Sequence, residues 1–436
     1  LQWTIDAYTL VLASLLILAG STGDRLGRRR TFQTGLVLFT AGSLLCSIAP
    51  GLGWLIAFRM VQAVGGSMLN PVAMSIITVV FTDPKERARA IGVWGGVVGI
   101  SLGVGPILGG LLTETIGWRA IFWVNVPIGV AAFVLAALFV PESRAVRARR
   151  VDPFGQALVL VLLASVSYAI IDAPRAGWLS TDTTALFAVA LGSLIGLLAY
   201  EPRRQDPLIE LRFFRSIPFS GATVIAVCAF GSFSGFMFMT TLYLQDVRGL
   251  DPLQAGLFLL PMATVTLLLA PISGRVVANR GPRLPLFVAG TTITLAGLSL
   301  TGLTGHTSYG WLIGSIVLYA VGFGAVNAPI TNTAVSGMPR AQAGVAAAVA
   351  STSRQIGAAL GVAVIGSVLN AGAGGQLPTD LARASHTGWW IVTIAGFMVL
   401  LLGAATTGQR ARNSAASTAE LLQTDAPEPS LAGAGS

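Results

Sequence analysis

The chain has 436 residues, of which 54% are hydrophobic and only 10% are charged, and its formal net charge is +9. Soluble globular proteins carry about 25% charged residues, so this composition excludes an ordinary soluble domain. No HExxH, CxxC or GxxxxGK[ST] motif occurs, and Cys46 and Cys228 each lie in an apolar run. The sequence therefore indicates no metal site, disulfide framework, cofactor or ATP-driven nucleotide domain.

Long apolar runs dominate the chain, and a helix needs about 20 apolar residues to cross a bilayer. On that measure we predict an all-α polytopic membrane protein with thirteen spans, near residues 4–22, 32–49, 54–80, 90–112, 118–140, 154–171, 183–200, 218–243, 254–273, 284–304, 310–335, 344–369 and 388–407. Residues 201–217 interleave apolar and charged side chains, which fits either a short helix on the inner surface or a plain linker. The tail beyond Gln409 is rich in Ala, Ser, Thr and Pro, so we expect it to be disordered.

Most of the 27 Lys and Arg residues fall in alternate gaps between these runs, whereas the opposite gaps hold only Arg119, Arg175, Arg248 and Arg383. This positive-inside pattern predicts a cytoplasmic C-terminus. It also explains the net charge without a nucleic-acid partner, because the basic residues form no continuous face. Thirteen spans that end inside place Leu1 outside without a signal peptide, so we expect one further span upstream and fourteen in all.

Two inner loops share a pattern. GSTGDRLGRRR (20–30) and GRVVANRGPR (274–283) both contain Gly-x6-Gly-x-Arg. Such a correspondence predicts an internal repeat with a binding site between the halves. Glycines allow tight turns there, and Asp24 suits a helix N-terminus. A basic loop with an ordinary cap would explain one copy, and the second copy favours the repeat.

Arg59 lies inside the apolar run LIAFRMVQAVGG, and Gln62 shares its helix face at i+3. A charge near mid-bilayer costs about 2.5–3.5 kcal/mol on the insertion scale, which predicts a polar cavity or an acidic partner. The alternative is that Arg59 snorkels from near the outer end. Asp6, the only clear carboxylate inside the predicted spans, either joins Arg59 in a proton path or caps its helix.

The run GVWGGVVGISLGVGPILGG (92–110) places small residues at four-residue spacing, which is typical of close helix packing. The Gly105–Pro106 pair that follows can kink the helix. A plain packing seam is an equally good interpretation of this run taken alone.

Together these segments resemble the Major Facilitator Superfamily (MFS), and within it the fourteen-helix drug:proton antiporter family. The first inner loop is similar to the family's gate motif, which assigns a gating role to Gly20, Asp24, Arg25, Gly27, Arg28 and Arg29. The family's antiporter motif matches Gly92, Gly105, Pro106, Gly109 and Gly110. Ser101 replaces one glycine of that motif, and the family's acid-bearing first helix has no counterpart here.

The resemblance implies an MFS fold with two six-helix bundles and an inserted helix pair, 13 of 14 helices being present. The expected domains are an N-terminal bundle (1–140), the inserted pair with linkers (141–217), a C-terminal bundle (218–407) and the tail (408–436). It also implies proton-driven export by alternating access across the plasma membrane. We expect proton coupling at Asp6 and Arg59.

Polar residues inside the spans are candidates for the substrate cavity, although many such residues only join helices. The candidates are Tyr8, Gln62, Asn70, Asn327, Asn332 and Arg354. The expected partners are a small amphipathic substrate, protons and membrane lipid, acting on a monomer that has no catalytic residues. Proton-linked uptake of a small nutrient, which Ser101 favours weakly, and a non-transporting sensor or scaffold stay open as alternatives.

Overall fold

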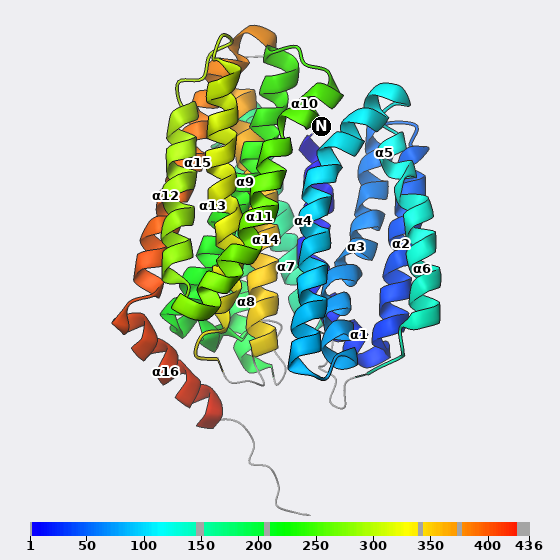
Figure 1. The fold of residues 1–436 in the computed structure, drawn as a ribbon, viewed down its shortest axis with the longest axis vertical. Helices are drawn as coiled ribbons and strands as arrows, with labels where there is room; N and C mark the ends of the chain where they lie inside the picture. The colour runs from blue at the N-terminus through cyan, green and yellow to red at the C-terminus, as the bar shows by residue number, and fades with distance from the viewer. Residues whose placement is uncertain (1, 145–151, 205–209, 339–342, 373–376, 425–436) are drawn as a thin grey trace, which may run out of the picture.

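The computed structural model describes residues 2–144, 152–204, 210–338, 343–372 and 377–424. Within these ranges the chain forms helices and no β-strand, so the predicted all-α fold is confirmed. The helices run nearly side by side and group into two bundles (Figure 1). Long parallel rods suit a bilayer, because each helix satisfies its own backbone hydrogen bonds without water.

The first bundle is built from six helical segments. They are α1 (Gln2–Leu26), α2 (Arg28–Ser47), α3 (Leu52–Val80), α4 (Pro84–Thr115), α5 (Ala120–Trp123) and α6 (Asn125–Phe139). The inserted pair is α7 (Pro153–Ala176) and α8 (Thr181–Tyr200).

The second bundle begins after two short 3-10 turns, η1 (Glu201–Arg203) and η2 (Leu211–Arg215). Its helices are α9 (Ile217–Leu242) with the π turn η3 (Tyr243–Val247), α10 (Pro252–Phe258), α11 (Leu260–Arg280), α12 (Arg283–Leu300), α13 (Tyr309–Val335), α14 (Ala343–Gly372) and α15 (Leu377–Thr406). Phe213 of η2 is fully buried and packs edge-on against Phe219 of α9. The described part of 201–217 is therefore closer to the predicted short helix than to a plain linker.

Helices cover all thirteen predicted spans, but fewer of them qualify as membrane spans on their own composition. In the described residues ten helices are long and apolar enough, or eleven if α1 counts as one span bent by 50°. The helix α2 falls short because it starts with three arginines and is rich in Thr, Ser and Gly. The predicted number of thirteen therefore stays a prediction.

The two inner loops that share a glycine pattern adopt the same turn. Gly27 (φ +115°) joins α1 to α2, and Gly281 (φ +80°) joins α11 to α12. In each case the glycine N–H donates to the carbonyl four residues earlier, Gly23 and Val277 respectively. A positive φ strains any residue with a Cβ, so the shared glycine reflects a shared backbone. The shared glycine pattern therefore corresponds to a similar helix ending in both loops. The internal repeat itself stays a prediction.

The bundles touch along two seams. Helix α1 packs against α14, and α4 packs against α10 and α11. The second seam is tight, because a Cβ on Gly110 would lie 2.5 Å from the carbonyl oxygen of Pro252. In return, a Cβ on Gly256 would lie 2.5 Å from the carbonyl oxygen of Pro106. In Figure 1 the helix α10 lies at the top, at the end of the bundle away from α16.

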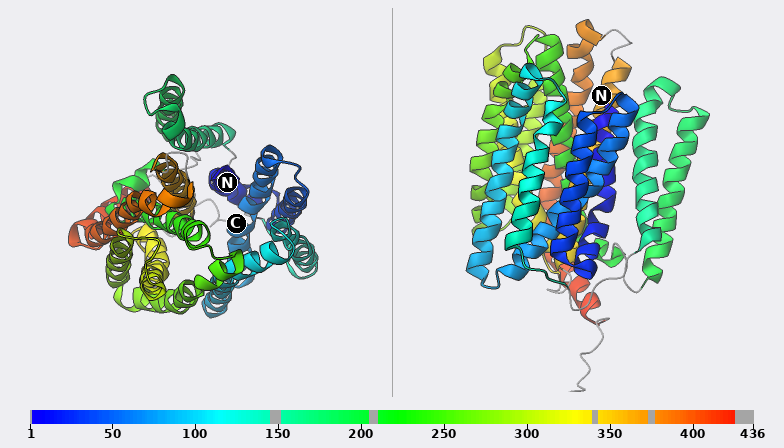
Figure 2. Two further views of the ribbon diagram at one scale, coloured as in Figure 1. Left: turned by 90° about the horizontal axis from the view of Figure 1, so that it is seen from above. Right: turned by 90° about the vertical axis from the view of Figure 1, so that its right-hand side faces the viewer.

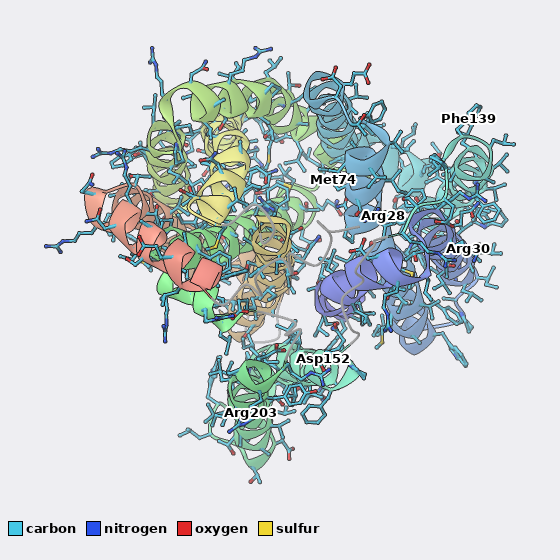
Figure 3. The ribbon with its side chains drawn as sticks, turned by 90° about the horizontal axis from the view of Figure 1, so that it is seen from below. Arg28, Arg30, Met74, Phe139, Asp152 and Arg203 are labelled. Atoms are coloured by element: carbon cyan, nitrogen blue, oxygen red, sulfur yellow. The ribbon has the colours of Figure 1, made fainter. Side chains whose placement is uncertain are left out.

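The inserted pair stands outside both bundles, as the view from above shows (Figure 2). Among the described residues α7 makes the main contacts with them, and it packs against both α1 and α14, where the two bundles meet. A hydrogen bond from Gln156 to the backbone oxygen of Ser14 ties α7 to α1. Seen from below, Asp152 and Arg203 lie with this pair, well apart from Arg28 and Arg30 on the first bundle (Figure 3).

Burial differs between the bundles. The second bundle holds one continuous core that includes Phe236, Tyr319 and Trp389, whereas the first holds a small cluster around Val11 and Ala63. Large apolar residues such as Leu138 (70% exposed) cover outer faces, as expected of surfaces that meet hydrocarbon. A mostly apolar groove of about 1010 Å³ also opens in the first bundle between α2, α4, α5 and α6.

The tail departs from the sequence prediction. Residues Gln409–Thr424 form a helix, α16, which lies across the lower end of the second bundle (Figure 1). Its Ala411, Ala415 and Leu422 side chains are buried, and its Ser414 hydroxyl accepts the N–H of Ile217 at the start of α9. The prediction of disorder was therefore wrong for this segment, because one apolar face repeats at helical spacing.

Candidate functional site

Arg59 is held in the first half of α3 by contacts within α3 and from two neighbouring helices, α1 and α5. Its Nε donates to the carbonyl oxygen of Thr4 in α1 at 3.0 Å, and one terminal nitrogen donates to Gln62 Oε1 at 2.6 Å. The guanidinium lies over the ring of Tyr8 at 4.0 Å and 5.9 Å from the ring of Phe122. The alternative of a freely snorkelling side chain does not fit, because these contacts point the arginine into the bundle.

Gln62 extends this network to a third helix. Its side chain is 2% exposed, and its amide nitrogen donates to the hydroxyl of Ser43 in α2 at 2.6 Å. A Cβ on Gly42 would lie 2.7 Å from the Gln62 backbone, so the glycine lets α2 and α3 come close enough for this bond. The hydrogen bonds of Arg59, Gln62 and Ser43 therefore link α1, α2 and α3 around one positive charge.

Arg354 forms a second cationic centre, partly buried in the second bundle. From α14 its guanidinium donates to the carbonyl oxygen of Asn327 at 3.4 Å and to the hydroxyl of Thr331, both on α13. It lies 5.8 Å from the ring of Phe230 in α9. Its Nε is buried and has no hydrogen-bond partner among the described residues. The described contacts of this charge thus come from helices of the second bundle.

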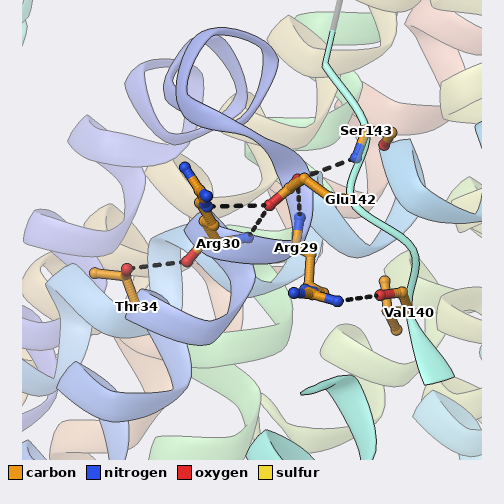
Figure 4. A network of polar contacts seen from close by, with 6 residues as sticks. All are labelled: Arg29, Arg30, Thr34, Val140, Glu142 and Ser143. Carbon is orange, nitrogen blue, oxygen red and sulfur yellow. Dashed lines mark hydrogen bonds and ion pairs between the residues drawn. The ribbon is translucent and has the colours of Figure 1, made fainter. Parts of the chain in front are cut away.

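The gate motif is organised by an ion pair and by a carboxylate from another loop. Asp24 pairs with Arg28 at 2.7 Å across the Gly27 turn. Glu142, which follows α6, accepts the backbone N–H groups of Arg29 at 3.2 Å and Arg30 at 3.3 Å (Figure 4). These N–H groups open α2, so Glu142 caps that helix in place of a local side chain and also interacts with its dipole.

Two further hydrogen bonds join the same two segments. The side chain of Arg29 donates to the carbonyl oxygen of Val140 at 3.3 Å, and the N–H of Arg28 donates to that of Ser143 at 2.9 Å. The end of α6 is therefore bound to the start of α2. Gly27 is needed for this approach, because a Cβ there would lie 2.6 Å from Glu142 Oε1.

The predicted cavity residues divide into two groups and two outliers. Tyr8 and Gln62 surround Arg59, and Asn327 contacts Arg354 through its backbone. Asn70 and Asn332 are exposed and take no part in the described contacts of either centre. Among the described side chains no contact joins the Arg59 group to the Arg354 group, so the structure holds two centres, one in each bundle.

The remaining predicted residues have mixed outcomes. Pro106 and Gly110 of the antiporter motif form the close seam with α10, whereas a Cβ on Gly105 or Gly109 would meet nothing within 4 Å. Asp6 falls within α1, but its side chain lies outside the described residues, and the same is true of the surroundings of Gly92. In the gate motif, Arg25 is exposed and Gly20 has open space around it.

Several residues of the site were not found from the sequence, among them Ser43, Phe122, Phe230, Thr331 and Glu142. Ser43 and Phe122 are neutral residues in apolar runs, where nothing distinguishes them from packing. Glu142 carries a detectable signal, because it is an acid at the start of a loop that is otherwise basic (PESRAVRARR). An acid that breaks the charge pattern of a loop suggests a specific partner such as a helix N-terminus.

Comparison with known proteins identifies the family. The pattern described as Major Facilitator Superfamily matches residues 1–362. The chain is 34% identical over 384 residues to "Multidrug resistance protein Stp" of Mycobacterium tuberculosis (strain CDC 1551 / Oshkosh), which covers 88% of this chain and 71% of that protein. It is 36% identical over 386 residues to the "Tetracenomycin C resistance and export protein" of Streptomyces glaucescens, with coverage of 88% and 71%.

Solved structures agree on the fold. A POT family transporter in complex with a thioalcohol-conjugated peptide superimposes with a TM-score of 0.67 at 16% identity, over 94% of this chain and 89% of that chain. At this identity the likeness concerns the arrangement of helices and not the substrate. The family match, the relatives and the two helical bundles lead to one conclusion: the chain belongs to the Major Facilitator Superfamily.

Proposed function

We propose that this membrane protein exports small amphipathic molecules, including drugs, in exchange for protons. The observation that carries the proposal is the similarity, over most of the chain, to relatives named for multidrug resistance and for export of an antibiotic. The buried, hydrogen-bonded Arg59 supports it, because an ionisable group inside a membrane bundle is costly and is a mark of function. A family of transporters gives no support to an enzymatic role.

The mechanism is alternating access between the two bundles. The tight α4–α10 seam closes one end, and the Gly27 and Gly281 turns lie at the other. We place the basic turns and α16 in the cytoplasm, following the positive-inside rule. In this arrangement the outer end is closed. Transport requires the α4–α10 seam to open while the Asp24–Arg28 end closes. The two ends open in turn, and the site at the arginines lies between them.

Proton movement supplies the driving force. A difference of one pH unit is worth about 1.36 kcal/mol per proton. The membrane potential adds about 2.3 kcal/mol per charge per 100 mV. We assign the proton path to Asp6 and Arg59. Protonation of the Asp6 carboxylate would change the strength of the interaction between Arg59 and α1. The Arg59–Thr4 hydrogen bond is the described contact through which that change would reach α1.

Expression in a bacterial host that lacks its main efflux pumps tests the proposal. Cells that carry this protein are expected to accumulate less rhodamine 6G or less fluorescein than cells with an empty vector. The difference should vanish when an uncoupler dissipates the proton gradient. Greater accumulation of both dyes would indicate uptake, and unchanged accumulation of both would indicate a non-transporting protein; either result would contradict the proposal.

A further inference from the structure

Three phenylalanines form a stacked wall beside Arg354. Phe233 of α9 lies parallel to Phe323 of α13, with ring centroids 4.0 Å apart and planes at 10°. Phe230 meets Phe323 edge-on at 5.3 Å, and the Arg354 guanidinium lies 5.8 Å from the ring of Phe230. A continuous row of aromatic faces therefore leads from a buried positive charge toward the seam between the bundles.

The far end of this wall opens on a small cavity. It has a volume of about 30 Å³ and is lined by Pro106, Phe233, Met237, Leu259, Met262, Ala263, Thr266 and Phe323. Thr266 is 7% exposed, and its hydroxyl has no hydrogen-bond partner among the described residues. A buried hydroxyl without a partner is costly, so a ligand that offers a hydrogen bond at this point would be favoured.

Arg354 has a hydrogen-bond donor that no described residue uses. One terminal nitrogen is used by α13, but the Nε is buried and without a described partner. No described carboxylate lies within 4 Å of the guanidinium. A partly buried arginine in this condition attracts an anion, because guanidinium presents several donors in a plane that matches a carboxylate or similar group.

We infer that the substrates of this transporter are flat aromatic molecules that carry an acidic group. This inference rests on the proposed export function and names the substrate class of the same cavity. The ring system lies against Phe233 and Phe323, and the soft Met237 and Met262 side chains fill the irregular space around it. The acidic group is directed toward Arg354, and a hydroxyl or carbonyl of the ring system reaches Thr266.

The cavity also explains why such a site is hidden in this conformation. A drug-sized ligand needs roughly 300–1,000 Å³, far more than the volume present. Of the lining residues only Pro106 comes from the first bundle, on the α4–α10 seam. Separation of α4 from the second bundle removes that wall and enlarges the cavity, so the binding surface forms when the bundles part.

Two dyes with the same three-ring xanthene core test the charge preference. Fluorescein is anionic and rhodamine 6G is cationic, and each is offered to proteoliposomes with an imposed pH gradient. We expect the purified protein to transport fluorescein faster, and we expect Arg354→Gln to reduce the fluorescein-to-rhodamine ratio by about tenfold or more. Arg354→Lys should keep most of the preference. Arg383→Gln, which removes an exposed arginine, should leave the ratio unchanged.

The aromatic wall is tested separately. Phe233→Leu should raise the KM for both dyes several-fold, whereas Phe397→Leu, on an exposed face of α15, should not. If rhodamine 6G is transported and fluorescein is not, or if Arg354→Gln keeps the native ratio, the inferred substrate class is wrong while export stands. If neither dye moves under any gradient, the proposed function itself fails.

Discussion

At the scale of single residues, the two partly buried arginines are stabilised in the same way. Each guanidinium donates to a backbone carbonyl of a neighbouring helix and lies near an aromatic ring. Each also bonds one neutral polar side chain, Gln62 for Arg59 and Thr331 for Arg354. In an apolar interior these contacts replace the hydration that the charge has lost.

Gln62 is the most sensitive point of the first centre. We expect Gln62→Leu to lower the unfolding temperature in detergent and to reduce transport about tenfold or more. The substitution keeps the volume but leaves the Arg59 nitrogen and the Ser43 hydroxyl without their partner, at about 1–3 kcal/mol for each buried group. Gln62→Glu keeps the acceptor for Arg59 and should retain more stability. Equal losses in the two variants would show that the hydrogen bond is unimportant.

Glu142 gives a second prediction at this scale. Glu142→Ala removes the acceptor for two N–H groups at the start of α2, so we expect a loss of about 1–2 kcal/mol in stability. Glu114→Ala, which removes an exposed acid at the end of α4, is the matched control and should have no measurable effect. Chemical or thermal unfolding of the purified variants measures the difference. Identical curves would contradict the capping role.

Charged residues of the site can be predicted from the sequence, whereas its neutral residues cannot. Arg59 and Arg354 are visible because a charge interrupts an apolar run, and Gln62 follows from helical spacing. Ser43, Phe122 and Phe230 cannot be told from packing residues, since only tertiary contacts bring them to the guanidinium groups. The side-chain position of Asp6 was not settled by sequence either, because a carboxylate near a helix start fits both a cap and a proton path.

At the scale of secondary-structure elements, the α4–α10 seam is the feature that closes one end of the molecule. Two glycines, one on each helix, remove side chains where the backbones approach. The sequence predicted small-residue packing on α4 but could not name the partner helix. Sequence also predicted the breaks less well than the spans: the segment 118–140 divides into α5 and α6, and 254–273 divides into α10 and α11.

Gly110 is expected to control the opening of this seam. A methyl group there would overlap the backbone of Pro252, and overpacking of this kind costs about 1–3 kcal/mol. Gly110→Ala should therefore favour the conformation that is open at this end and slow transport about tenfold. Its neighbour Gly109→Ala meets open space and should transport normally.

Spin labels at Leu111 and Leu257, which are exposed on α4 and α10, measure the effect directly. Gly110→Ala should shift the distance distribution to longer values, and Gly109→Ala should not. An unchanged distribution in both variants would remove the seam from the gating mechanism.

At the scale of the whole molecule, the bundles are related but unequal. Matching the Gly27 turn to the Gly281 turn pairs α4 with α14 and α6 with α15. In the second bundle α9 packs against both α14 and α15, whereas the mostly apolar groove of the first bundle lies between α4 and α6.

The energy source is the claim on which the whole account depends. The decisive measurement is the lumenal pH of proteoliposomes that are loaded one pH unit more acid than their surroundings, recorded while a transported dye is added outside. Exchange predicts that dye accumulates in the lumen above its external concentration while the lumen becomes more alkaline, and that Arg59→Gln abolishes both changes. Dye uptake with no change in lumenal pH, or with further acidification of the lumen, would contradict proton-coupled exchange.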